Sequence, residues 1–398
     1  MRVLLVAQGP SHVPWLIPLS WAARLQGHDV LLATRPPHVG QVTRAGLPVA
    51  AVGSEDRIAA LQNEVKQSFV AEVRQRMREE GAEDGFAPTE REVLIAGGRK
   101  MIAIADGMAD ETVALVRAWR PDVIVHDTGA LVGRVAAAAA GIPAVGHTWG
   151  TTMGGFLDVA DEGIMPQFAP LFRRFGAEPV TGTAGWIDPS PPSLCTPLPF
   201  RRIGLRYTPY SGPGEVPDWL LAPGHRPRVC LTLGVSEAGG GGLHGEEAQR
   251  RLLHALTAYG ADVVVAVKDA RDLPGSAVPS GGRVVESFPL DLLLPTCAAV
   301  IHHGGVGTGM TSLALGVPQL VMTGHMVQRH WGQLVRNAGA GLTVEATAGA
   351  DEVRAAVKRL LTDPALRSGA AGVRAEMAAM PSPSQVVGFL EECAAGAV

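Results

Sequence analysis

Short apolar runs alternate with longer amphipathic segments along this chain, and the alternation stops near residue 215 before it starts again. Each apolar run has the length of a buried strand, and each segment between two runs has the length of a helix. Strands and helices in this alternation predict a parallel sheet with helices on its faces. Because 398 residues exceed what one core usually holds, we expect an α/β protein with two consecutive doubly wound, Rossmann-like domains facing across a cleft.

The pattern is regular enough to place most strands and one helix. The strands expected in the first half are Arg2–Gln8, Asp29–Thr34, Pro48–Val52, Val123–His126 and Ala144–His147. Those expected in the second half are Val229–Leu233, Asp262–Val267, Arg283–Glu286, Ala299–His302 and Gln319–Met322. Between the first two strands, Pro14–Gln26 predicts a helix, because proline suits a first helical turn and Gly27 suits a helix end.

The expected domain limits lie where the alternation of strand-like and helix-like segments is interrupted. Residues 188–228 are rich in proline, and Tyr207–Gly214 has the composition of a linker. We expect domains at 1–208 and 227–382, a linker at 209–226, and a C-terminal helix, 383–398, that packs back on the first domain. The charged, helix-like segment Glu55–Gly85 is either a mobile lid or a solvated helix that ends in a loose turn.

Composition excludes several classes of partner. The net charge is −4 and no long run of like charges occurs, which argues against a nucleic-acid or acidic-membrane surface. The first apolar run, Val3–Ala7, is too short for a signal peptide or a membrane span. The four scattered cysteines lack a CxxC spacing and fit a reduced cytoplasm: Cys195, Cys230, Cys297 and Cys393.

The strongest local signal is the segment Ala299–Thr311, in which a buried strand runs into glycines and a helix is expected to begin at about Thr308. Glycines let the backbone approach a ligand closely, and the first turn of a helix favours anions. His303 could therefore donate to a phosphate oxygen, and Thr308 could cap the helix or bind phosphate. The alternative is a tight turn with two structural histidines. The spacing matches neither a dinucleotide fingerprint nor a Walker loop.

Two further residues follow strands of the first half. His12 comes just after the first strand, where an imidazole can act as a general base, or can be an exposed loop histidine with no chemical role. Asp127 ends the apolar run that begins at Val123, where a carboxylate can orient His12 or simply cap a helix. Both positions lie at the carboxyl ends of strands, where α/β sheets bind their ligands.

A metal site is not expected. The histidines that could be combined have no suitable spacing and no carboxylate beside them: His302, His303, His325 and His330. The Asp-x-Asp pattern of metal-chelating sugar-nucleotide sites is absent as well. We therefore expect neither a metal nor a resident cofactor.

The motifs together resemble a known family over nearly the whole chain. Val300–Gly341, VIHHGGVGTGMTSLALGVPQLVMTGHMVQRHWGQLVRNAGAG, is similar to the donor-binding region of the family 1, GT-B glycosyltransferases that decorate polyketide and other antibiotics. Further similar stretches are SHVPWLIPLSWAARLQGHDV at Ser11–Val30, AWRPDVIVHDTGALVGRVA at Ala118–Ala136, DPSPPSL at Asp188–Leu194 and RYTPYSGPGEVPDW at Arg206–Trp219. The combination is especially similar to actinobacterial deoxysugar transferases.

The resemblance implies a role for each matching residue. His12 falls on the family's general base, Asp127 on its acidic partner, and His303 on the histidine that meets the diphosphate. The other positions that it implies for donor binding are Gly234, Ser236, Ser287, Phe288, Gly305, Gly307, Thr308, Val327 and Gln328. Two of them depart from the family, because Ser287 replaces an aromatic that often stacks on the base, and Val327 replaces an acid.

The resemblance also implies the reaction and its substrates. We expect inverting, metal-independent transfer of a (deoxy)sugar from a nucleotide diphosphate, dTDP by analogy, to a hydroxyl of a polyketide-like aglycone. The first domain would bind the acceptor and the second the nucleotide sugar, and a homodimer is left open. Acceptor contacts are expected among apolar residues of which at least half belong to the core: Trp15, Trp149, Phe156, Ile164, Met165, Phe168 and Phe172. The alternatives are a carbon-linked transferase, a nucleotide-sugar epimerase and a non-enzymatic partner of a transferase.

Overall fold

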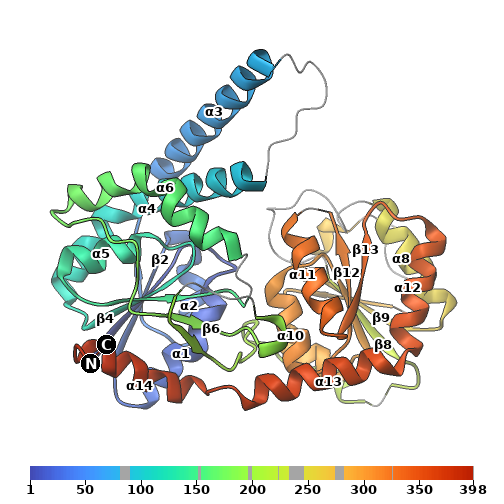
Figure 1. Cartoon of the computed structure of the whole chain (residues 1–398). Coiled ribbons are helices and arrows are strands. Elements are labelled where there is room, and N and C mark those ends of the chain that lie inside the picture. The colour runs from blue at the N-terminus through green and yellow to red at the C-terminus, as the bar shows by residue number, and fades with distance from the viewer. Residues whose placement is uncertain are drawn as a thin grey trace. The chain divides into compact units, whose positions relative to one another are not determined.

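The computed structural model describes residues 1–80, 90–150, 154–195, 200–222, 224–232, 246–273, 282–324 and 326–397. The chain forms two compact units (Figure 1). The first unit is Met1–Asp188, Thr196–Leu205 and Pro381–Val398, and the second is Pro189–Cys195 and Arg206–Met380.

The first unit is built on a sheet of seven parallel strands in the order β3-β2-β1-β4-β5-β6-β7. The strands are β1 (Arg2–Ala7), β2 (Asp29–Thr34), β3 (Val49–Ala51), β4 (Val123–Asp127), β5 (Ala144–His147), β6 (Trp186–Asp188) and β7 (Arg202–Gly204). Its helices are α1 (Val13–Leu25), α2 (Val39–Arg44), α3 (Glu55–Glu80), α4 (Glu90–Trp119), α5 (Val132–Ala140), α6 (Gly154–Arg174) and α14 (Pro383–Ala394), with a short 3₁₀ turn η1 (Pro36–His38).

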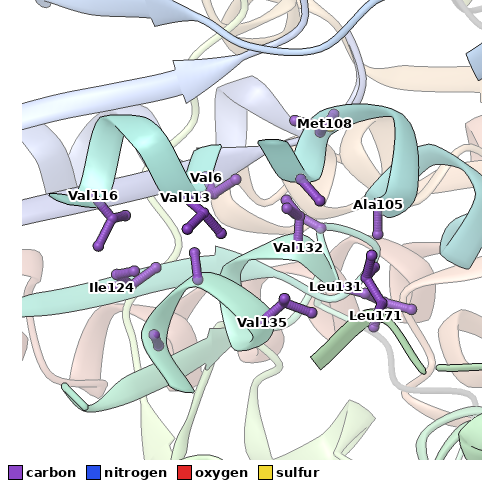
Figure 2. Packing of buried hydrophobic residues seen from close by; sticks show 14 of the residues in the cluster. Val6, Ala105, Met108, Val113, Val116, Ile124, Leu131, Val132, Val135 and Leu171 are labelled. Atoms are coloured by element: carbon purple, nitrogen blue, oxygen red, sulfur yellow. The ribbon is translucent and has the colours of Figure 1, made fainter. Parts of the chain in front are cut away.

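The core of the first unit lies between this sheet and helices α4, α5 and α6. Figure 2 shows Val6 of β1 next to Val113 of α4 and Ile124 of β4 below Val116 of α4, with Val135 of α5 in the same cluster. All of these side chains are buried. Burial of both faces of β1 and β4 explains why their sequences are continuous apolar runs and not alternating ones.

The second unit repeats the architecture with six parallel strands in the order β10-β9-β8-β11-β12-β13. The strands are β8 (Arg228–Thr232), β9 (Asp262–Val267), β10 (Arg283–Glu286), β11 (Ala299–His302), β12 (Gln319–Thr323) and β13 (Gly341–Glu345). Its α-helices are α7 (Asp218–Leu221), α8 (Glu246–Ala258), α9 (Leu290–Leu293), α10 (Val306–Leu315), α11 (Met326–Asn337), α12 (Ala350–Thr362) and α13 (Pro364–Ala379). The described part of this unit also has the 3₁₀ turns η2 (Pro192–Leu194), η4 (Ala270–Asp272) and η5 (Leu294–Thr296).

The strand order of each sheet reverses at one point, between β1 and β4 in the first unit and between β8 and β11 in the second. Helices that leave the two strands at such a point lie on opposite faces, which opens a crevice at the carboxyl ends of the strands. The fold therefore places the residues after β1, β4 and β11 where an α/β protein binds its ligands. The expected α/β class with two doubly wound, Rossmann-like units is confirmed.

The chain returns to the first unit at its C-terminus, where α14 packs against α1 (Figure 1). Ser382 and Gln385 form a capping box that fixes the start of α14. Near its end, Glu391 Oε1 lies 3.0 Å from His28 Nε2. Within the described part of the chain, no helix is both long enough and apolar enough to cross a membrane.

The structure differs from the sequence-based elements at several places. Strands β6, β7 and β13 were not expected, and helix α10 begins at Val306 and not near Thr308. Tyr207, the first residue of the stretch with a linker-like composition, belongs to the second unit, and its hydroxyl lies 3.1 Å from Thr311 Oγ1. The segment expected to be either a lid or a solvated helix is helix α3 as far as Glu80, and residues 81–89 lie outside the described part.

Candidate active site

Two side chains of the first unit meet at the point where its strand order reverses. After β1 the chain turns at Gly9, whose carbonyl accepts the His12 N–H at 3.0 Å, and His12 becomes the N-cap residue of α1. Asp127 is the last residue of β4, which pairs with β1. The turn brings His12 Nδ1 to 3.1 Å from Asp127 Oδ1. The structure therefore brings together the two residues singled out at these strand ends.

Asp127 is held as an anion without being exposed to water. It is fully buried, and its carboxylate accepts the backbone N–H groups of Gln8 at 3.1 Å, Gly129 at 2.7 Å and Ala130 at 3.2 Å. Burial by itself raises the pKa of the Asp127 carboxyl, but the adjacent imidazole and the donated backbone hydrogen bonds together hold it below its usual value. Asp127 does not cap α5, because the N-cap residue of that helix is Leu131. Its carboxylate instead accepts backbone N–H groups of the turn after β4 and contacts His12.

This arrangement prepares His12 for proton transfer. A carboxylate at Nδ1 favours the tautomer with a proton on that nitrogen, which leaves the lone pair of Nε2 to accept a proton. The side chain of His12 is 17% exposed, so a substrate can reach it. The buried negative charge of Asp127 also stabilises the imidazolium that forms when the proton arrives. The pair can therefore act as a general base with its orienting partner.

The second unit contributes a turn suited to an anion. Strand β11 ends at His302, Gly304 follows with φ +85°, and Gly305 caps α10 from an extended conformation. The first N–H groups of an α-helix have no partner within the helix, and they point with the positive end of its dipole at whatever lies before it. Gly307 and Thr308 lie in this first turn. A phosphate here would meet several N–H donors.

The two histidines of this turn have different roles. His302 is fully buried, its Nε2 lies 2.8 Å from Gln319 Oε1, and its Nδ1 accepts the Gly304 N–H at 3.2 Å. Burial lowers the pKa of His302 to about 3, so this imidazole is neutral and holds the turn in place. His303 is only partly buried, and its ring lies against Gly305, where a Cβ atom would be 2.8 Å from Nε2. Of the two, His303 is the one able to meet a ligand.

The other expected donor residues occupy varied environments. Ser287 has a φ of +46°, which is unusual for a residue with a side chain, and its Oγ donates to the Lys268 carbonyl at 3.0 Å. Phe288 packs beside a core cluster of the second unit. Gln328 is buried and its Oε1 accepts the Gly324 N–H at 2.7 Å, whereas Val327 is 39% exposed at the start of α11. Gly234, Ser236 and His325 lie outside the described residues.

The residues expected to contact the acceptor occupy different environments in the described part of the chain. Phe168 has no exposed surface and packs edge-on against Phe172 at 4.8 Å in the core, so it offers no face to a ligand. Trp15 is also buried in α1. Trp149 follows β5, and its ring centroid lies 4.3 Å from that of His12. Phe156 belongs to α6, but its side chain lies outside the described part.

Sequence reasoning did not single out the residues that support the His12 side of the site. Gln8 donates through its backbone, which no side-chain pattern reveals. Thr148 and Asp188 are buried and hydrogen-bonded to each other at 2.7 Å. The available signal was position, since both stand at the carboxyl ends of strands of the first sheet. In the described residues, no group of three or more His, Cys, Asp or Glu side chains is arranged to hold a metal.

Comparison with known proteins connects this geometry to a family. The models for the N-terminal and C-terminal domains of erythromycin biosynthesis protein CIII-like proteins match residues 21–234 and 250–393. The chain is 34% identical over 429 residues to the aclacinomycin-T 2-deoxy-L-fucose transferase of Streptomyces galilaeus, covering 99% of this chain and 96% of that protein. This match spans both units, including the His12–Asp127 pair and the turn before α10.

Solved structures show the same architecture. The glycosyltransferase VinC in complex with dTDP has a TM-score of 0.82 at 27% identity, with 100% of both chains covered. The spinosyn rhamnosyltransferase SpnG complexed with thymidine diphosphate has a TM-score of 0.79 at 30% identity, covering 98% of this chain and 100% of that one. The chain is therefore a glycosyltransferase of the GT-B fold and belongs to the erythromycin biosynthesis protein CIII-like family.

Proposed function

We propose that this enzyme transfers a deoxysugar from a dTDP-linked donor to a hydroxyl group of a polyketide-like natural product, with inversion at the anomeric carbon. The observation that carries the proposal is the contact between His12 Nδ1 and the buried carboxylate of Asp127 at 3.1 Å. A base held in this way removes a proton from a hydroxyl nucleophile. In inverting transfer, such a base acts on the acceptor and not on the donor.

The proposed step is a single in-line displacement. The acceptor oxygen attacks the anomeric carbon and its proton passes to His12 Nε2. The bond between the anomeric carbon and the diphosphate oxygen breaks, and the electron pair leaves with dTDP. Because the nucleophile enters opposite the leaving group, the configuration inverts. Asp127 keeps the imidazole oriented and balances its positive charge after the proton arrives.

The leaving diphosphate needs positive charge or hydrogen-bond donors, because negative charge grows on it as the bond breaks. We assign this role to His303, to the N–H groups of Gly307 and Thr308, and to the dipole of α10. These groups take the place that a divalent metal has in other transferases. We therefore propose that the reaction does not depend on a metal.

The donor assignment is supported by relatives and by one residue of this chain. The relative from Streptomyces galilaeus is named for transfer of 2-deoxy-L-fucose, and VinC is solved with dTDP. Val327, partly exposed at the start of α11, offers an apolar surface that accepts no hydrogen bond. A sugar carbon without a hydroxyl group gives up no hydrogen bond to water when it packs against a valine. A buried hydroxyl in the same place would lose its hydrogen bonds to water, at a cost of about 1–3 kcal/mol.

The acceptor assignment is supported by a complex of a relative. SpnG has also been solved with spinosyn aglycone, at the same TM-score of 0.79 and 30% identity to this chain. On the strength of that relationship, we propose a hydrophobic aglycone of the polyketide type. His12, the proposed base for the hydroxyl of the aglycone, lies in the first unit. We therefore assign acceptor binding to the first unit.

A transfer assay tests the proposal. The purified protein is incubated with dTDP-deoxysugars and a panel of macrolide and anthracycline aglycones in excess EDTA, and products are identified by mass spectrometry and NMR. We expect a glycoside whose anomeric configuration is opposite to that of the donor, and an oxygen linkage that acid cleaves. Retained configuration, a tenfold loss of rate restored by magnesium, or donor epimerised without any acceptor would each contradict the proposal.

A further inference from the structure

The His12 imidazole has an aromatic neighbour that the proposed mechanism does not use. Its ring centroid lies 4.3 Å from that of Trp149, with the two planes inclined by 41°. Asp127 contacts the Nδ1 edge of the same ring, and a Cβ atom at Gly9 would lie 3.7 Å from it. The imidazole is therefore bounded by a carboxylate, by an indole and by the backbone at Gly9.

The indole of Trp149 is itself closely confined. A Cβ atom at Gly129 would lie 3.2 Å from Trp149 Cζ2 and 2.1 Å from Gln8 Nε2, so a larger residue there would displace the end of the Gln8 side chain and crowd the indole. Trp149 Nε1 is buried and has no hydrogen-bond partner among the described residues. Because the indole N–H makes no hydrogen bond to the described residues, we take the ring itself to be what Trp149 contributes here.

The backbone that carries Trp149 is fixed on both sides. Thr148, the residue before it, is fully buried and uses its N–H, its carbonyl and its hydroxyl in hydrogen bonds. The N–H donates to Ile187 O at 2.9 Å, and the carbonyl lies 2.7 Å from His147 Nδ1. After Trp149, Gly150 has a φ of +78°, which favours glycine. The direction in which the indole leaves the backbone is thus determined.

A buried carboxylate completes this support. The Thr148 hydroxyl donates to Asp188 Oδ1 at 2.7 Å, and Asp188 Oδ2 accepts Arg202 Nε at 2.7 Å. Asp188 is 1% exposed, and a buried charge is retained where it is paired and hydrogen-bonded. The chain of contacts runs from Arg202 through Asp188 and Thr148 to the backbone of Trp149, and from the indole to His12.

We propose that Trp149 is a positioning residue for His12, one that holds the imidazole against Asp127 and stabilises its protonated form through the π electrons of the indole. Aromatic faces attract cations, and the attraction acts only after His12 has taken up a proton. Trp149 would thus help the transition state more than the resting enzyme. The proposal rests on the proposed function in taking His12 as the base.

Among the described residues, the titratable groups that interact with His12 belong to β4 and η1. Asp127 of β4 contacts it directly, and His38 of η1 interacts with it electrostatically. Arg35 and Glu55 act on His38 in turn. Substitution of Trp149 leaves all of these groups in place, so a change in the titration of His12 would report on the indole.

NMR of protein with labelled histidine tests the proposal without any substrate. The His12 ring signals are assigned by their loss in His12→Asn and then followed against pH in Trp149→Leu and Trp149→Phe. We expect the indole ring current to shift the wild-type signals upfield, and Trp149→Leu to abolish this shift. The midpoint of the His12 titration should fall by about 0.5 pH unit in Trp149→Leu, and by less in Trp149→Phe. Unchanged signals and an unchanged midpoint would overturn the proposal.

Two further sets of variants separate this effect from general damage. Trp119→Leu removes a tryptophan at the opposite edge of the sheet, where its carbonyl accepts Arg2 Nη1, and should leave the His12 titration unchanged. Thr148→Val should shift the midpoint in the direction of Trp149→Leu, and Thr148→Ser should restore it. If His12→Ala kept full turnover, the proposed function would fail while these NMR results still decided the role of Trp149.

Discussion

His12 Nδ1 lies 3.1 Å from Oδ1 of Asp127, a carboxylate with no exposed surface that also accepts three backbone N–H groups. The contact joins the end of β4 to the residue that caps α1, so it depends on the pairing of β1 with β4. The pairing of these two buried strands therefore holds His12 and its carboxylate partner in position. The reactivity of His12 is tied to the fold of this unit.

Asp127→Asn tests this relationship. The amide keeps one oxygen for the N–H groups of Gly129 and Ala130, but it carries no charge and presents an NH₂ group elsewhere. We expect kcat to fall roughly 10–10²-fold, because the neutral amide no longer stabilises the imidazolium, although the retained oxygen can still accept the Nδ1 proton of His12. Binding of dTDP, measured by calorimetry, should not change. Wild-type kcat in a folded Asp127→Asn protein would contradict the role given to this residue.

Gly305→Ala tests the anion-binding turn. A Cβ atom at this position would lie 2.8 Å from His303 Nε2, so the imidazole must move away from the start of α10. We expect the Kd for dTDP to rise at least about tenfold, since a charge-assisted hydrogen bond is lost or weakened. Gly349→Ala is the matched control, because Gly349 also caps a helix from an extended conformation and a Cβ atom there meets nothing within 4 Å. Equal affinity in both variants would argue against His303 as a phosphate ligand.

Three buried histidines predict how stability depends on pH. Burial lowers the pKa of His126 and of His147 to about 4, and that of His302 to about 3. Between pH 6.5 and about 4, these three histidines are therefore protonated in the unfolded chain but neutral in the folded protein. The free energy of unfolding decreases as the pH falls through this range. By pH 5 the loss is on the order of 2 kcal/mol for each histidine.

Urea unfolding followed by circular dichroism at pH 7.5 and pH 5 measures this loss. His302→Gln should reduce the dependence on pH, whereas His225→Gln, which changes an exposed histidine, should leave it as in the wild type. The comparison uses the change with pH within each variant, so a constant effect of the substitution on stability cancels. A wild-type midpoint that did not move between the two pH values would show that these histidines are not held neutral.

Val327→Asp tests the proposed basis of donor selection. The valine is 39% exposed at the start of α11, where an added carboxylate can accept hydrogen bonds from sugar hydroxyls and is favoured by the helix dipole. We expect the ratio of kcat/KM for a deoxysugar donor to that for a glucosyl donor on the same nucleotide to fall by about tenfold, which corresponds to about 1.4 kcal/mol. Competition between the two donors measures this ratio directly. An unchanged ratio, or a wild-type preference for the glucosyl donor, would refute the explanation.

The fold could be predicted where burial on both faces of a strand leaves a continuous apolar run. Strands β2, β5, β9, β10 and β11 have the limits expected from the sequence. The limits of β1, β3, β4, β8 and β12 differ from the expected ones by one residue at one or both ends. The strands β6 and β7 have three residues each, too few for any periodicity, and they lie among prolines. Strand β13 starts with Gly341, where a Cβ atom would lie 2.2 Å from Gln319 O, so tertiary packing and not propensity selects its first residue.

The site could be predicted in part, because position at a strand end is visible in sequence and contact is not. His12 and Asp127 follow recognisable strands, so their proximity follows from the topology. The different roles of His302 and His303 depend on which ring turns inward toward Gln319, and adjacent residues with the same side chain give no sign of this. The support from Thr148 and Asp188 could not be seen either, since it joins two strand ends 40 residues apart through one hydroxyl.

The role of His12 as the base is tested most directly by turnover in His12→Ala with a dTDP-deoxysugar and its aglycone, measured together with the Kd for dTDP. Removing a general base typically costs about 10²–10⁴-fold in rate. We predict a loss of this size in kcat with the Kd for dTDP unchanged, because the proposed nucleotide-binding groups belong to the second unit. Turnover within a few-fold of the wild type, with an acceptor hydroxyl of ordinary acidity, would contradict it.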